Sequence, residues 1–117
     1  MRIVNVSKGV VLAEQATIAD TFLKRAKGLL GKKELNPGVA MVIKPCNSIH
    51  TFFMRFPIDV LFVDKENKVV KVFSVVKPFR ISAVYFSAYY VVELPAGVVG
   101  SSLTCAGDII SVSANCA

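Results

Sequence analysis

The order of strand-like and helix-like segments constrains the fold of this chain more than any other feature. Short runs of β-branched and aromatic residues recur between clusters of turn residues, and only one early segment has helical spacing. Because helical segments do not alternate with the strands, an array of βαβ units is excluded. The sequence predicts a mostly β fold: a single-domain antiparallel β-sandwich or open barrel of about six to eight strands, with one short α-helix packed on it.

The positions of the turns separate the predicted strands. Pro37 and Gly38 suit a turn because proline pre-sets its backbone angle and glycine accepts a positive one, and the polar run 64–68 is typical of a hairpin loop. Consecutive apolar residues in 58–63 and 91–95 predict strands that are covered on both faces. The strand predictions are residues 2–6, 10–19, 39–44, 46–64, 69–76, 89–94 and 108–113.

The predicted helix covers residues 20–31. Thr21 is a candidate N-cap, and Gly31 stands where a left-handed C-cap belongs. Leu23, Ala26 and Leu30 recur at helical spacing and predict the buried face. Replacing Leu30 with alanine should therefore cost stability, whereas the lysines of this helix should be exposed.

Length and composition bound the class of protein. A chain of 117 residues fits one domain, which we expect to span residues 1–117. Its 54% hydrophobic and 19% charged residues exclude intrinsic disorder. No apolar stretch approaches the roughly 18 residues of a membrane span, and the first residues lack the features of a secretory signal. We therefore expect a soluble, cytoplasmic monomer.

The formal charge of +6 could attract nucleic acid, anionic lipid or an acidic small molecule. The densest basic patch, residues 24–33, also carries the apolar residues of the predicted helix, so it is interpreted as a solvated helix face rather than a nucleic-acid site. A small anionic ligand or a protein partner is favoured instead. The three cysteines are interpreted as isolated thiols, and whether Cys105 and Cys116 pair stays open.

Residues 46–64 hold the only histidine of the chain in an otherwise apolar run. If this run were one extended strand, His50 and Met54 would face one way, and Thr51 and Arg55 the other. Pro57 cannot donate to a strand ladder and is typical of an edge or a bulge, which could re-aim the residues that follow it.

Two chemistries are disfavoured for this run. Cys46, His50 and Met54 have a spacing similar to that of a blue-copper ligand loop, but such a site needs two histidines, so no metal or other cofactor is predicted. A thiol nucleophile would need Cys46 beside His50, and an extended path separates them by roughly 13 Å. Only a turn at residues 45–48 could bring them together.

General acid–base chemistry needs a carboxylate that orients His50, and the candidates are Asp59 and Glu93. Each is a single acid in a strongly apolar strand, where a carboxylate is rarely buried without a partner. The alternative is structural: His50 and Asp59 satisfy backbone groups, or each other, inside the sandwich.

Five motifs together resemble an uncharacterised family, the domain of unknown function 192. They are RAKGLLG at 25–31, SIHTFFMRFPIDVLFVD at 48–64, VVKPFR at 75–80, VELPAG at 92–97 and AGD at 106–108. The resemblance covers about residues 8 to 113 and implies a small β-sandwich-like domain with one helix packed on it and no established activity. The characteristic polar positions that it implies are Arg25, His50, Thr51, Met54, Asp59, Glu93 and the turn at Gly107 and Asp108.

These observations lead to one hypothesis and one alternative. The chain is expected to be a binding or accessory module for a small anionic ligand or a partner protein, with His50 on the rim of a cleft. The alternative is a hydrolase-like enzyme with His50 as general base, oriented by Asp59 or Glu93. The proposed catalytic residues are His50 and Asp59, and the proposed binding residues are Thr51, Met54, Arg55, Glu93, Arg80 and Arg25.

Overall fold

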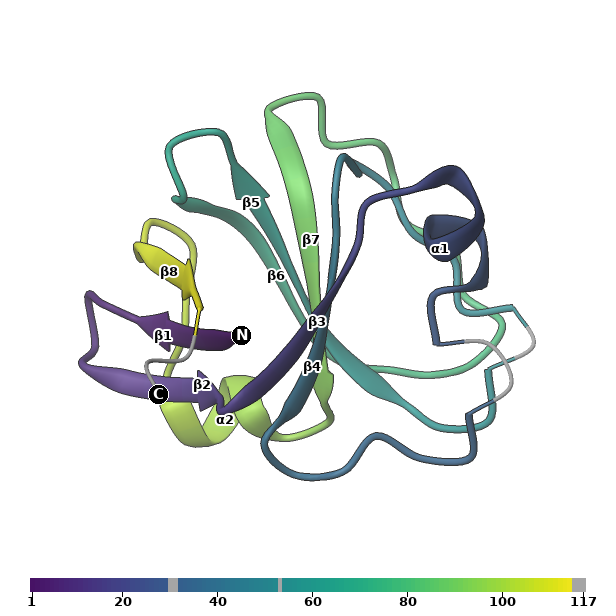
Figure 1. Cartoon of the computed structure of the whole chain (residues 1–117), viewed down its shortest axis with the longest axis horizontal. Helices are drawn as coiled ribbons and strands as arrows, with labels where there is room; N and C mark the ends of the chain where they lie inside the picture. The colour runs from purple at the N-terminus through teal and green to yellow at the C-terminus, as the bar shows by residue number, and fades with distance from the viewer. Residues whose placement is uncertain (30–31, 53, 115–117) are drawn as a thin grey trace.

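A computed structural model of the chain describes residues 1–29, 32–52 and 54–114. Strands β3, β4, β7, β5 and β6 form one sheet in that order, and β2, β1 and β8 form a second (Figure 1). The predicted mostly β fold is confirmed, and the two sheets do not close into a barrel. The elements are β1 (Arg2–Asn5), β2 (Val10–Ala13), β3 (Gln15–Ala19), α1 (Phe22–Lys27), β4 (Val39–Ile43), β5 (Ile58–Asp64), β6 (Val69–Val76), β7 (Ala88–Pro95), α2 (Val98–Ser102) and β8 (Ile110–Ser113).

Both faces of the five-stranded sheet are covered, as the continuous apolar runs predict. The three-stranded sheet lies on one side of it, and α1 lies on the other (Figure 1). Strand β5 shows the alternation: Leu61 and Val63 enter the core between the sheets, whereas Val60 and Phe62 enter a second core on the opposite face. The second core is the one that borders α1 and the segment around Met54.

One strand pair is parallel. β3 pairs with β4 in parallel register from Gln15 beside Val39 to Ala19 beside Ile43, whereas the other pairs of the two sheets are antiparallel. A parallel pair needs a long crossover connection, and here that connection carries α1. The sequence pattern predicted the helix, but it did not predict that the strands on either side of the helix would pair in parallel.

Helix α1 is shorter than predicted. Thr21 is the N-cap, and its side chain accepts a hydrogen bond from the Lys24 amide at 3.2 Å. The helix ends at Gly28, with a positive φ of 48°, and not at Gly31. Leu23 is 78% exposed and Ala26 is also exposed, so the predicted buried face of the helix is wrong at both positions. The buried leucine of this region is Leu29, which follows the C-cap Gly28 and lies beyond the helix. Leu30 and Gly31 lie outside the described residues.

A second short helix, α2, was not predicted, and a buried carboxylate from β5 caps it. Asp59 Oδ2 accepts hydrogen bonds from the amides of Gly97 at 3.0 Å and Val99 at 2.8 Å. Its Oδ1 accepts a third, at 2.7 Å, from the amide of Val75, which has a positive φ of 53° at an irregularity between β5 and β6. Within the described part of the chain, neither helix is long and apolar enough to cross a membrane.

The strand predicted over residues 46–64 begins only at Ile58. Residues 46–52 and 54–57 instead follow an irregular path, and His50 makes a single bridge to Ile81. Thr51, fully buried, donates to the Lys77 carbonyl at 2.7 Å and accepts from the Arg80 amide at 2.9 Å. The segment is therefore fixed by bonds to the loop before β7, and its residues Ile49, Met54 and Phe56 pack in the second core.

Candidate functional site: a pocket beneath α1

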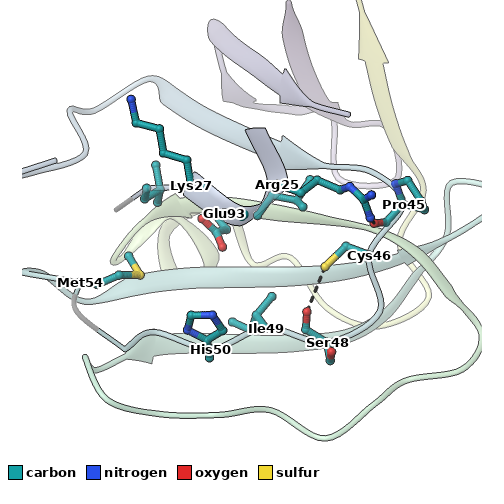
Figure 2. Close-up of a pocket in the computed structure, with 13 residues that line it drawn as sticks. Arg25, Lys27, Pro45, Cys46, Ser48, Ile49, His50, Met54 and Glu93 are labelled. Atoms are coloured by element: carbon teal, nitrogen blue, oxygen red, sulfur yellow. Dashed lines mark hydrogen bonds between the residues drawn. The ribbon is translucent and has the colours of Figure 1, made fainter. Parts of the chain in front are cut away.

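A pocket of about 150 Å³ opens where α1 and the segment after β4 meet the second face of the central sheet. Figure 2 shows Glu93 projecting into it above His50 and Met54, with Arg25 extending toward Pro45. The pocket thus combines ionisable groups from three separate elements. Its lining residues are Arg25, Ala26, Lys27, Gly28, Leu29, Ile43, Pro45, Cys46, Ser48, Ile49, His50, Met54 and Glu93.

Glu93 forms the buried polar end of this pocket. It lies on β7 at the centre of the sheet, between Met41 of β4 and Val60 of β5. Alternation along β7 places it on the face of Val91, toward the second core, and it is only 4% exposed. Its Oε2 atom is buried without a hydrogen-bond partner among the described residues. Burial raises the pKa of this carboxyl from 4.5 to about 7, because the charged form loses its hydration.

Arg25 supplies the second unsatisfied polar atom. Its Nη1 donates to the Pro45 carbonyl at 3.3 Å, whereas its Nε is buried and has no partner within the described part of the chain. The ion pairs that the structure contains in the described ranges do not include one between Arg25 and Glu93. Two residues that line the pocket thus each carry a buried polar atom, one donor and one acceptor, without a partner among the described residues.

The outer part of the pocket is more polar and more open. His50 is exposed, and its ring stacks on Phe52 with centroids 5.5 Å apart. Lys27 is exposed on the last turn of α1. The Cys46 thiol donates to the Ser48 carbonyl at 3.0 Å, and burial raises its pKa. A raised thiol pKa opposes formation of thiolate, so this environment does not favour a cysteine nucleophile.

The structure brings together four of the eight residues that the sequence nominated: Arg25, His50, Met54 and Glu93. Arg55 is exposed and does not line this pocket. Arg80 lines a separate apolar hollow of about 390 Å³, which shares only Ile49 with it.

Thr51 and Asp59 are buried beneath the surface and bond to backbone groups instead. Their contacts hold the loop before β7 and helix α2, respectively. Asp59 therefore does not line the pocket beside His50, and Glu93 is the acid that does.

Sequence reasoning did not nominate Lys27 and Ser48, which also line the pocket. Lys27 belongs to the basic run that was interpreted as a solvated helix face. The sequence feature that could have indicated Lys27 is its position two residues after Arg25, within the RAKGLLG motif of the family that the chain resembles. Ser48 carries no distinctive pattern, because its position depends on the irregular path of residues 46–50.

Glu93 should make stability depend on pH. Its folded pKa, about 7, lies above its ordinary 4.5, so the folded protein keeps a proton that the unfolded chain releases between these values. The stabilisation that comes from this bound proton is fully present below about pH 4.5 and is lost as the pH rises to about 7. We expect wild-type unfolding free energy to fall by roughly 3 kcal/mol over that range, and Glu93→Gln to lack this fall. Urea unfolding of the wild type and of Glu93→Gln at about pH 5 and pH 8 measures this difference. Both proteins contain His50, so His50 cannot cause it. Equal pH dependence of the two proteins would contradict the raised pKa of Glu93.

The chain is thus a small two-sheet β-protein with a polar pocket beneath its first helix. The chain belongs to the DUF192 family (Uncharacterized ACR), which it matches over residues 3–112, so the resemblance seen in its motifs is confirmed. It is 35% identical over 113 residues to a UPF0127 protein of Thermococcus kodakarensis, covering 93% of this chain and 71% of that protein. It is 42% identical over 114 residues to a UPF0127 protein of Pyrococcus horikoshii, covering 92% and 96%.

A solved structure shows the same fold. The crystal structure of a protein of unknown function from Novosphingobium aromaticivorans superimposes with a TM-score of 0.81, covering 95% of this chain and 82% of that one. The two are 19% identical, so the likeness concerns the fold alone.

Proposed function

We propose that this protein binds a small anionic ligand in the pocket beneath α1. The observation that carries the proposal is the pair of buried, unpartnered atoms among the described residues, Glu93 Oε2 and Arg25 Nε. Buried polar groups are nearly always hydrogen-bonded, and leaving one unsatisfied costs about 1–3 kcal/mol. A ligand that accepts from Arg25 and bonds to Glu93 would satisfy both groups at once.

Charge and size narrow the ligand further. Arg25 and Lys27 are cationic, whereas Glu93 is the only carboxyl among the lining residues that the structure describes. This balance favours an anion. The volume of about 150 Å³ is smaller than the roughly 300–1,000 Å³ of a drug-sized site, which favours a molecule of a few non-hydrogen atoms.

Acid–base catalysis is a second candidate, and Glu93 is the observation that favours it. A general acid or base works best when its pKa lies near the working pH, and burial raises the pKa of Glu93 to about 7. Glu93 and His50 both line the pocket, so the two could act on one bound molecule. Turnover of a bound ligand that is lost in Glu93→Gln, with binding retained, would favour an enzyme over a binding module.

The binding proposal is tested by ¹H–¹⁵N NMR titration with sodium formate, propionate, lactate and phosphate. We expect at least one anion to shift the amides that border the pocket, and Arg25→Met to weaken that binding about tenfold or more. Lys24→Met is the matched control, because Lys24 lies on the same helix, is exposed and does not line the pocket. His50→Ala should cost less than about 1 kcal/mol of stability while weakening binding.

Two results would contradict the proposal. One is the absence of pocket shifts with every anion of the panel. The other is equal affinity of wild type and Arg25→Met for the anion that binds.

A further inference from the structure

We propose that the ligand is a short-chain carboxylic acid, bound so that its carboxylate shares one proton with Glu93 in the pocket that Arg25 and Lys27 also line. This inference rests on the proposed function and names its ligand class. It requires that one proton be bound together with the ligand anion whenever Glu93 is ionised beforehand.

The two unpartnered atoms define what the ligand must offer. Arg25 Nε can only donate, so the ligand group facing it must be an acceptor. Glu93 Oε2 accepts when ionised and can donate when protonated. A carboxylate can accept the proton of Glu93 with one oxygen, and its other oxygen can accept a hydrogen bond from a donor of the pocket.

Two carboxylates this close cannot both be ionised in a buried site. Like charges that share a site raise one pKa strongly, and the stable arrangement is one proton held between the two groups. Glu93 is already suited to this arrangement, because burial alone brings its pKa to about 7. A dianion such as phosphate would place a second negative charge beside Glu93, which favours a monoanionic acid.

The charges of the groups that face Glu93 favour the binding of one anion rather than several. Helix α1 contributes Arg25 and Lys27, and the segment after β4 contributes Cys46 and His50. The flanking strands place Met41 and Val60 beside Glu93, and neither can ionise. The Cys46 thiol stays protonated because burial raises its pKa, so the positive charge of Arg25 and Lys27 on α1 is left for the ligand.

The proton balance predicts the pH dependence. Below about pH 7, neutral Glu93 donates to the incoming carboxylate and no proton is taken up. At higher pH, the ionised Glu93, the ligand anion and one proton from solvent combine. Affinity should therefore fall about tenfold for each pH unit above 7, since one proton is bound per ligand.

The test is an NMR titration of the full-length protein with sodium propionate at about pH 5.5, 7 and 8.5. Propionate stays ionised throughout, so the ligand itself adds no pH dependence. We expect wild-type affinity to fall more than tenfold between about pH 7 and 8.5. Glu93→Gln, which keeps a neutral donor, should bind propionate with the same affinity at all three pH values. His50→Gln, which changes the histidine that also lines the pocket, is the control and should keep the wild-type pH dependence.

The outcomes separate the two levels of the proposal. If propionate binds the wild type equally at all pH values, or if His50→Gln removes the pH dependence of binding, the proposal of a shared proton is overturned. Either result would leave the proposed anion site in place. If another anion of the panel binds at the pocket and propionate does not, the carboxylic-acid class is overturned. If none of the anions binds at any pH, both this inference and the proposed function are overturned.

Discussion

Replacing Asp59 with alanine should lower the free energy of unfolding by about 4 kcal/mol or more. Asp59 is fully buried and accepts three backbone hydrogen bonds, from Val75, Gly97 and Val99. Its loss leaves three amides without their acceptor, each at a cost of about 1–3 kcal/mol. The Val75 amide belongs to a β-branched residue with positive φ, a conformation that the surrounding structure must hold in place. Urea unfolding of Asp59→Ala at neutral pH measures the effect.

Asp64→Ala provides the matched control for this prediction. Asp64 also accepts backbone hydrogen bonds, from Glu66 and Lys68 at 2.9 Å each, but these lie in the exposed hairpin turn between β5 and β6. Water can replace an exposed acceptor, so we expect a loss of only about 1 kcal/mol. Similar losses in the two variants would mean that Asp59 does not hold α2 and the β5–β6 irregularity as described.

Replacing Phe62 with alanine should cost about 3–5 kcal/mol. Its side chain is fully buried in the second core, and its ring lies 4.7 Å from that of Tyr85 and 6.1 Å from that of Phe73, centroid to centroid. The substitution removes a large apolar side chain and these aromatic contacts, and it leaves a cavity in the second core. Chemical denaturation monitored by circular dichroism gives the change.

Phe86→Ala is the matched control, because it removes the same aromatic side chain from an exposed position. Phe86 is 89% exposed in the loop before β7, so its truncation should change stability by about 0.5 kcal/mol or less. A cost for Phe62→Ala as small as that for Phe86→Ala would contradict the placement of the second core on this face of the sheet.

The strands were predictable because their signals are local. Turn residues mark the ends of β4, β5 and β6, and the consecutive apolar residues of β5 predicted burial of both its faces. The segment before Ile58 has similar composition but forms no strand. Cys46, Ile49, Met54 and Phe56 of this segment pack in the second core, and its backbone bonds to the loop before β7, so composition alone could not separate the two cases.

The candidate site was predictable in part. A lone acid in an apolar strand drew attention to both Asp59 and Glu93, and the same signal has two different structural causes. Asp59 is paired with amides up to 40 positions away along the chain, whereas one oxygen of Glu93 is left unpaired in a pocket. The difference depends on the positions of α2 and α1 relative to the sheet, which no pattern within either strand encodes.

The most direct test of the account is a ¹³C NMR titration of the Glu93 side-chain carboxyl, with and without sodium propionate. The account predicts an apparent pKa of about 7 for free Glu93, caused by its burial, and a further rise when propionate is bound. A Glu93 carboxyl that titrates near its ordinary 4.5 and does not respond to propionate or to any other anion of the panel would contradict it.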